Sequence, residues 1–335
     1  MPTAKKIFIP ILLFSFLFFI FGLVSAQTTD SNQVSISLSP EQPGPRQKTT
    51  VRLVSFAIDL DRASIVWSLN GKKALSGIGE KELSFVTGAV GNTSSVSVSI
   101  VSALLGTITK SLSVTPGEIV LIWEASDSYT PPFYKGKALP PPQGSIKIVA
   151  IPNIKSGGLL IKPENLVYQW RRNDKAIQAS SGFGKNILSI KNGYTDLVEN
   201  IEVTASPSDG SITAQGRVFV TLIDPEIILY ENRPLEGVYY ESMLPGRFTL
   251  DNEEIKINAE PYYFSSLNKE KSSLLFSWII NGKETVSDKS DPSTISLRRE
   301  SGASGLSDVS LGVKNKTRIL QEADTNLIVK FGTTQ

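Results

Sequence analysis

The chain has 335 residues, with 34 basic and 32 acidic side chains, and it contains neither cysteine nor histidine. These absences exclude disulfides, the usual zinc and haem sites, and any catalytic unit built on histidine or cysteine. We therefore expect no cofactor, no metal site and no enzymatic activity. A hydrolase using two carboxylates is less favoured, because nothing in the sequence marks such a pair.

The N-terminus has the layout of a secretory signal. Lys5 and Lys6 precede an apolar stretch of 18 residues at 7–24, and small residues at 24–26 fit a cleavage site. We predict a signal peptide over residues 1–26 and an extracellular or cell-surface location. The stretch is close to the ~20 residues that cross a bilayer, so a retained anchor is the alternative and the chain's predicted membrane contact.

The predicted mature chain, 27–335, carries 32 basic and 32 acidic residues, and the two signs are mixed along its length. Nucleic-acid-binding proteins usually concentrate an excess of basic residues on one face. We therefore expect no nucleic-acid partner. Other surface proteins or envelope glycans are the expected partners of an exported chain of this kind.

Apolar and polar residues alternate in short segments along the whole mature chain. Such segments lie at 34–38, 96–100, 146–149, 201–204, 255–257 and 309–313. A period of two predicts strands with one buried face. Gly, Pro, Asn and Asp separate the segments at the spacing of a sandwich or barrel, so we predict an all-β fold.

One pattern occurs three times: Trp, two residues, Asn, Gly or Asp, then Lys. The tryptophans are Trp67, Trp170 and Trp278, which are 103 and 108 residues apart. One buried Trp per ~100 residues is typical of immunoglobulin-like sandwiches, so we assign the three to the structural core. The Asn-Gly or Asn-Asp pair suits a hairpin turn with positive φ.

Matching segments before the second and third tryptophans place boundaries near 116–117 and 224–225. We predict three tandem immunoglobulin-like β-sandwich domains at 27–116, 117–224 and 225–335. The linkers are very short, which predicts a stiff rod. The first repeat lacks the leading segment of the other two, so the sequence leaves open whether it is a complete sandwich.

The Trp-x-x-Asn-Gly-Lys hairpin within a repeat of ~100 residues resembles bacterial exported and surface proteins with tandem immunoglobulin-like or PKD-like domains. The resemblance covers the whole mature chain. It brings no known activity with it.

Several aromatic residues outside the repeated hairpin are candidate ligand contacts. They are Trp123, Tyr129, Phe133, Tyr134, Tyr239 and Tyr240. Most lie in a proline-rich segment at 129–142 or in its copy at 237–245. Either segment could be an exposed contact loop or an irregular edge strand whose prolines block aggregation. Asp59 and Asp61 could contribute to a calcium site, but two carboxylates are few and a turn is favoured.

Two functions fit these observations. The first is a structural, adhesion or interaction protein of the cell surface, supported by export, stiff tandem domains and the missing catalytic residues. The alternative is a carbohydrate- or peptidoglycan-binding module, which needs an exposed strip formed by the aromatic residues named above.

Overall fold

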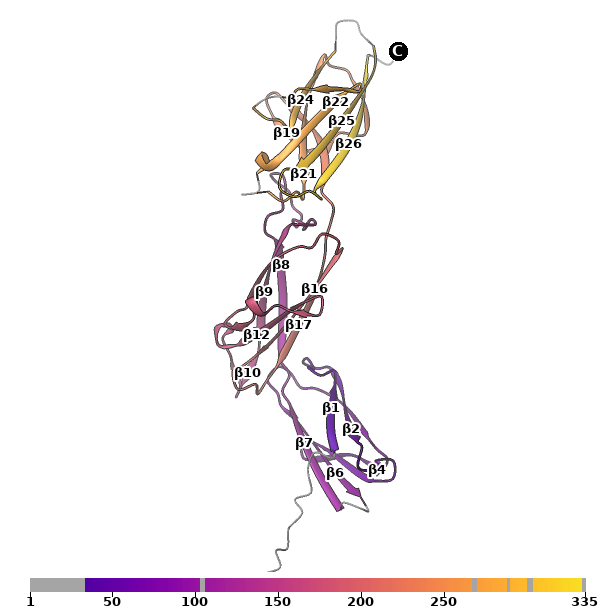
Figure 1. Ribbon diagram of the computed structural model, residues 1–335, viewed down its shortest axis with the longest axis vertical. Helices are drawn as coiled ribbons and strands as arrows, with labels where there is room; N and C mark the ends of the chain where they lie inside the picture. The colour runs from indigo at the N-terminus through magenta and orange to yellow at the C-terminus, as the bar shows by residue number, and fades with distance from the viewer. Residues whose placement is uncertain (1–33, 103–105, 267–269, 288–289, 300–303, 333–335) are drawn as a thin grey trace, which may run out of the picture.

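The computed structural model describes residues 34–102, 106–266, 270–287, 290–299 and 304–332. The predicted signal peptide at 1–26 lies outside these residues. Three β-sandwich domains follow one another along the long axis of the molecule (Figure 1). The described ranges contain no α-helix, and thus no helix with the length and apolar character needed to span a membrane.

Domain 1 is a complete sandwich of two antiparallel sheets, ordered β1-β2-β5 and β4-β3-β6-β7. Its strands are β1 (Val34–Ser39), β2 (Lys48–Ser55), β3 (Ser64–Leu69), β4 (Lys72–Ile78), β5 (Glu82–Val86), β6 (Ser94–Ser102) and β7 (Gly106–Val114). The question left open by the sequence, whether the first repeat forms two sheets, is therefore answered: it does.

Domain 2 repeats this topology, with sheets ordered β15-β9-β8 and β13-β12-β16-β17; β14 also pairs with β12, and β10 pairs with β11. Its elements are β8 (Glu118–Ala125), β9 (Ser145–Asn153), β10 (Lys155–Ser156), β11 (Leu159–Leu160), η2 (Pro163–Asn165), β12 (Val167–Arg172), β13 (Lys175–Ala176), η3 (Gln178–Ser180), β14 (Gly182–Phe183), β15 (Ile187–Lys191), β16 (Val198–Ser206) and β17 (Ala214–Thr221). The chain passes from β7 to β8 through residues 115–117 alone.

Domain 3 has sheets ordered β19-β18-β21-β24 and β20-β26-β25-β22-β23, in which β20 runs parallel to β26. Its elements are β18 (Glu226–Arg233), β19 (Gly237–Met243), β20 (Arg247–Leu250), β21 (Glu254–Tyr262), η5 (Lys271–Ser273), β22 (Leu274–Ile280), β23 (Lys283–Thr285), β24 (Thr294–Arg298), β25 (Gly305–Asn315) and β26 (Glu322–Phe331). The linker from β17 to β18 is residues 222–225.

The repeated tryptophans lie between the two sheets of their domains. Trp67, Trp170 and Trp278 are 0%, 0% and 1% exposed. Each indole N–H donates to a backbone carbonyl just before a strand of the opposite sheet. The acceptors are the carbonyl oxygens of Glu80, Lys185 and Pro292, at 2.7, 2.8 and 3.0 Å. Each ring therefore fills the core and also ties the two sheets together.

The repeated asparagine has two functions in the hairpin that follows the tryptophan. Asn70, Asn173 and Asn281 have φ of 50°, 47° and 49°, in the left-handed region that Asn tolerates better than most residues. Their side-chain Oδ1 atoms also accept the backbone N–H of the neighbouring strand, at 2.9 Å in each domain. The donors are Ser95 of β6, Asn200 of β16 and Asp308 of β25.

Candidate functional site

The segment 126–144 of domain 2, between β8 and β9, reaches across to domain 3. Its backbone forms a short ladder with residues 263–266, which include the isolated bridge Ser128–Ser265. The N–H of Tyr129 donates to Phe264, that of Tyr263 to Tyr129, and that of Ser266 to Asp127, at 2.8, 2.8 and 2.9 Å. Part of the proline-rich segment is therefore an interdomain connection, and it is not an edge strand of its own sheet.

Two buried glutamines add to this connection. The Oε1 atom of Gln143 accepts the backbone N–H of Leu320 at 3.0 Å. The Nε2 atom of Gln321 donates to the carbonyl of Pro142 at 2.7 Å. On the linker itself, the N–H of Ile223 donates to the carbonyl of Pro140 at 3.0 Å. Domains 2 and 3 are thus joined by a short linker that is also braced by a second segment of chain.

Tyrosines are concentrated at this junction, which holds seven of the nine in the chain. They are Tyr129, Tyr134, Tyr230, Tyr239, Tyr240, Tyr262 and Tyr263. The hydroxyl of Tyr134 pairs with that of Tyr263 across the junction, and the hydroxyls of Tyr230 and Tyr262 pair within domain 3, each at 2.8 Å. Edge-to-face ring contacts at 5.4–6.4 Å between centroids accompany these pairs.

A buried carboxylate lies beneath the tyrosines. Glu260 is 2% exposed and accepts the hydroxyl protons of Tyr129 and Tyr240 at 2.7 and 3.0 Å. Asn258 and the Lys271 ammonium also donate to it, at 2.8 and 3.0 Å. Burial, followed by the charge of Glu260, raises the pKa of Tyr129 and of Tyr240 well above the ordinary value for tyrosine. Both hydroxyls therefore stay protonated and donate at physiological pH.

An open groove lies on the surface of this junction and has a volume of about 560 Å³. Domain 2 supplies Phe133 and Tyr134 to its wall, and β19 of domain 3 supplies Tyr239 and Tyr240. We call this hollow the junction groove. Its lining is completed by Pro132, Lys135, Val238, Glu241 and Tyr262. The ring of Phe133 is 87% exposed, and its centroid lies 6.3 Å from that of Tyr240.

The hydroxyl groups that line the groove already have partners within the protein. Besides the pairs described above, the Tyr239 hydroxyl donates to Glu241 at 2.9 Å, and the Arg233 guanidinium lies 3.8 Å from the Tyr239 ring centroid. The groove therefore presents mainly the surfaces of rings held in fixed positions.

Four of the six predicted contact residues are brought together in this groove. Tyr129 is instead buried, 7% exposed, so it is corrected from a ligand contact to a residue that holds the junction. Trp123 lies elsewhere: it packs against the core of domain 2, and the Lys137 ammonium is 3.1 Å from its ring centroid. Trp123 also lines a smaller hollow of about 220 Å³ with Ile122.

The sequence analysis missed Glu260 and the tyrosines of β18 and β21 at this site. The consecutive aromatic residues Tyr262, Tyr263 and Phe264 were the available signal. Such a run does not fit a strand with one solvated face, because alternate side chains point in opposite directions. It indicated that both faces of the strand end are covered.

The Asp59 and Asp61 pair forms a turn in the structure. The backbone N–H of Asp61 donates to Oδ1 of Asp59 at 3.1 Å. Arg62 and Lys81 pair with the two carboxylates at 3.6 and 2.8 Å. Across the described ranges, no three or more His, Cys, Asp or Glu side chains are grouped to hold a metal ion.

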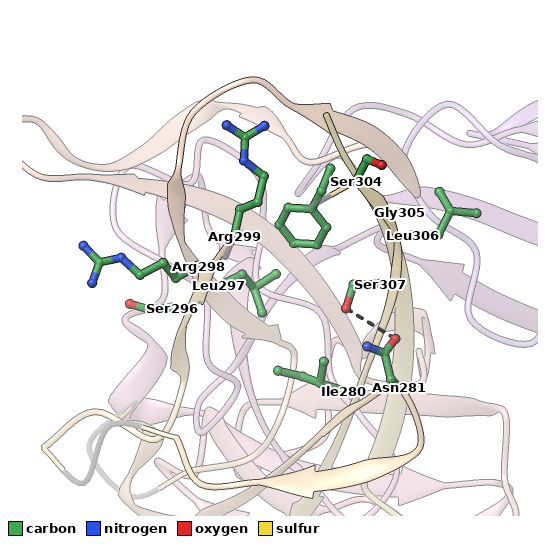
Figure 2. Close-up of a pocket in the computed structure, with 11 residues that line it drawn as sticks. Ile280, Asn281, Ser296, Leu297, Arg298, Arg299, Ser304, Gly305, Leu306 and Ser307 are labelled. Carbon is green, nitrogen blue, oxygen red and sulfur yellow. Dashed lines mark hydrogen bonds between the residues drawn. The ribbon is translucent and has the colours of Figure 1, made fainter. Parts of the chain in front are cut away.

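A second cavity of about 450 Å³ lies at the far end of domain 3 (Figure 2). Ile280 and Leu297 contribute apolar surface to it, and Ser307 donates to Asn281 at 3.4 Å on one side. In Figure 2 the guanidinium groups of Arg298 and Arg299 point away from Ile280 and Ser307. This cavity is the open end of the sandwich core, and the junction groove is the better candidate site.

Comparison with known proteins finds only remote structural similarity. No family model and no curated protein matches the chain. Solved structures do: three N-terminal domains of the bacteriophage RB49 outer capsid protein Hoc are 11% identical, with a TM-score of 0.25 over 90% of this chain and 99% of that one. The central fibronectin-III array of RIM-binding protein is 13% identical, with a TM-score of 0.29 over 90% of this chain and 96% of that one. Sidekick-1 immunoglobulin domains 1–4 are 13% identical, with a TM-score of 0.24 over 87% of this chain and 73% of that one.

The chain is a tandem array of immunoglobulin-like β-sandwich domains. Its own sheet order and its buried tryptophans show this fold. Every TM-score above lies below 0.5, so no function is carried over from these proteins. The resemblance to bacterial surface proteins, and to PKD-like domains in particular, stays a prediction.

Proposed function

We propose that this protein is an exported, non-catalytic interaction protein of the cell surface that binds its partner through the junction groove. The observation that carries the proposal is the groove itself, in which the ring of Phe133 is 87% exposed. The groove lies at a junction where both the linker and the segment 126–144 connect the two domains. The predicted signal peptide supports the location, and the absence of histidine and cysteine supports the non-catalytic role.

The backbone at Phe133 supports a binding function for this ring. Its φ is +64°, a left-handed conformation that is uncommon for a bulky residue and costs roughly 1–3 kcal/mol. Leaving the ring in solvent forgoes a further ~2 kcal/mol of burial. A strained backbone position that carries an exposed ring is typical of a binding surface, because such a conformation persists where the surrounding structure maintains it.

The lining of the groove gives little support to a hydrolase. Glu241 is the acidic residue among those that line it, and it accepts the hydroxyl proton of Tyr239. Glu260 lies below the lining and is occupied by four donors. Glycoside hydrolysis needs two carboxyl groups facing the same bond.

The binding of an envelope glycan is the second candidate for this groove. The exposed ring of Phe133 favours it, since a flat ring face can stack on the apolar face of a sugar. A protein partner and a glycan partner would use the same rings. The two are distinguished by which treatment of the envelope abolishes binding.

Binding to isolated envelopes of the producing cell tests this proposal. We expect Phe133→Ala combined with Tyr239→Ala to weaken binding at least about tenfold, the equivalent of ~1.4 kcal/mol. Phe56→Ala is the matched control, because Phe56 is fully exposed on domain 1. Protease treatment of the envelopes removes a protein partner, and periodate oxidation removes a glycan. Equal binding by the wild type and the groove variant would contradict the proposal.

A further inference from the structure

The junction groove offers a ligand few side-chain hydrogen-bond acceptors. Among the described residues that line it, Glu241 alone carries a carboxylate, and this group already accepts the hydroxyl proton of Tyr239 at 2.9 Å. The same described lining contains no asparagine, glutamine or aspartate. Glu260, beneath the tyrosines, is 2% exposed and is occupied by donors of the protein. A ligand rich in N–H or O–H groups would therefore leave many of them without a partner.

Hydrogen-bond donors remain available at the same groove. Lys135 lines it, and the Lys135 ammonium has no ion-pair partner among the residues that the structure describes. The hydroxyls of Tyr134 and Tyr263 share one hydrogen bond at 2.8 Å. One of the two donates to the other, so the second keeps its proton for a further acceptor. The groove is thus matched to a ligand that brings acceptors and few donors.

Aromatic rings form most of the surface of the groove. They belong to Phe133, Tyr134, Tyr239, Tyr240 and Tyr262. The ring planes of Phe133 and Tyr240 are tilted by 59°, and those of Tyr134 and Tyr262 by 80°. Rings held in fixed positions bind a compact, rigid apolar group at a low entropic cost, because neither side has to be ordered on binding.

Proline is the residue whose chemistry fits both properties of the groove. It has a compact apolar ring and a carbonyl oxygen, but it has no backbone N–H that needs an acceptor. A run of prolines adopts the polyproline II helix, which has no internal hydrogen bonds and leaves its carbonyls free to accept. Grooves lined by aromatic side chains bind such segments, since the helix is already formed before binding.

The chain holds a proline run of its own beside the same tyrosines. Leu139 packs against the buried tyrosine cluster of the junction, and Pro140 and Pro141 after it are buried. The carbonyl oxygens of the three prolines at 140–142 accept hydrogen bonds at 3.0, 2.8 and 2.7 Å, from the backbone N–H of Ile223 and the side-chain amides of Asn192 and Gln321. Donors alone are therefore sufficient to hold a proline-rich segment at this junction.

A glycan fits the groove less well than a proline-rich segment. The exposed ring of Phe133 can stack on the apolar face of a sugar or on a proline ring. A sugar, however, carries hydroxyl groups around its rim, and each of them is both a donor and an acceptor. Many of these hydroxyls would lose water without gaining an acceptor, which weakens binding. A peptide in which proline has removed the N–H groups avoids this loss.

We propose that the junction groove binds a proline-rich segment of a partner protein in the polyproline II conformation. The inference rests on the proposed function, in which this groove is the binding surface, and it names the chemical class of the ligand. Proline rings of the partner pack on Phe133 and on the tyrosines. Carbonyl oxygens of the partner accept hydrogen bonds from Lys135 and from the hydroxyl pair of Tyr134 and Tyr263.

Fluorescence anisotropy of labelled decaproline, titrated with the chain from residue 27 onward, tests the class of ligand. Ten prolines span ~30 Å in this conformation. We expect saturable binding that Phe133→Ala weakens at least about tenfold. Lys135→Ala should weaken it about threefold or more, because it removes a donor. A labelled peptide of five Gly-Ser repeats has the same length but an N–H at every residue, and it should not bind saturably.

Phe56→Ala is the matched control, since Phe56 is fully exposed on domain 1, and it should bind decaproline as the wild type does. The melting temperature of each variant shows that it is folded. The inference is overturned if the wild type does not bind decaproline, or if Phe133→Ala binds it equally well. Saturable binding of chitohexaose in place of decaproline, lost in Phe133→Ala, would assign the groove to glycans and also overturn it.

Binding to isolated envelopes separates a failure of this inference from a failure of the proposed function. If Phe133→Ala/Tyr239→Ala loses envelope binding while the wild type does not bind decaproline, the groove remains the binding surface and only the class of ligand is wrong. If that double variant binds envelopes as the wild type does, the proposed function is wrong, and the present inference fails with it.

Discussion

Replacing Trp170 with alanine is expected to destabilise domain 2 by about 3–5 kcal/mol, the range for removing a large aromatic side chain from a packed core. The ring is 0% exposed and belongs to the main core cluster of domain 2. Its loss leaves a cavity between the sheets and removes the hydrogen bond from the indole N–H to Lys185 at 2.8 Å. The Lys185 carbonyl then lacks a partner, which adds to the cost.

Urea unfolding followed by hydrogen exchange in β12 and β16 measures this loss within one domain of the chain. Trp123→Ala is the matched control, because Trp123 belongs to the same domain but is only partly buried at a sheet edge. It should cost less than half as much. Similar losses for the two variants would show that Trp170 does not hold the sheets together.

Replacing Glu260 with alanine is expected to destabilise domain 3 by about 3 kcal/mol and to loosen its junction with domain 2. The carboxylate is 2% exposed in its side chain and forms an ion pair with Lys271 at 3.0 Å. Without it, Lys271 is left without this partner in a largely buried place. The hydroxyls of Tyr129 and Tyr240 lose their acceptor at the same time.

Denaturant unfolding measures the stability, and a broadened distance distribution between spin labels on domains 2 and 3 reports the loosened junction. Glu254→Ala serves as the control, because Glu254 is an exposed residue of the same strand, 3.6 Å from Arg298. Surface pairs of this kind contribute ~1 kcal/mol or less. If Glu260→Ala left both the stability and the distance distribution unchanged, the junction would not depend on the buried carboxylate.

The repeated hairpin made the fold predictable from the sequence. A tryptophan at intervals of about a hundred residues, followed by Asn and Gly or Asp, reports a buried strand and a turn that are both local in the chain. Alternation in segments such as 146–149 reports which strand face is buried. These signals need no knowledge of distant contacts, and the all-β sandwich class follows from them.

The junction could not be predicted in the same way. Tyr129 and Glu260 are 131 residues apart, and their contact depends on how two complete domains are placed relative to each other. The proline-rich segment 126–144 and its copy at 237–245 also differ in structure. The first packs on the next domain, whereas the second contains β19, which pairs with β18. A shared sequence pattern therefore did not give a shared position.

The junction groove was predicted in part. The aromatic content of both segments identified Phe133, Tyr134, Tyr239 and Tyr240, and the structure places all four along one groove. The same content also selected Tyr129, which the structure buries. Composition identifies an aromatic residue but does not show whether its ring is exposed or buried. That is decided by how the ring packs against the other domain.

The central claim is that three sandwich domains are held end to end, and small-angle X-ray scattering of the chain from residue 27 onward tests it most directly. The longer strands of domain 2, such as β9 with nine residues, span ~30 Å, so three domains in line predict a maximum dimension of about 100 Å or more. We expect a radius of gyration near 30 Å and the cross-section of a single sandwich. A radius of gyration of about 19 Å, as for a compact globule of this length, would contradict the account.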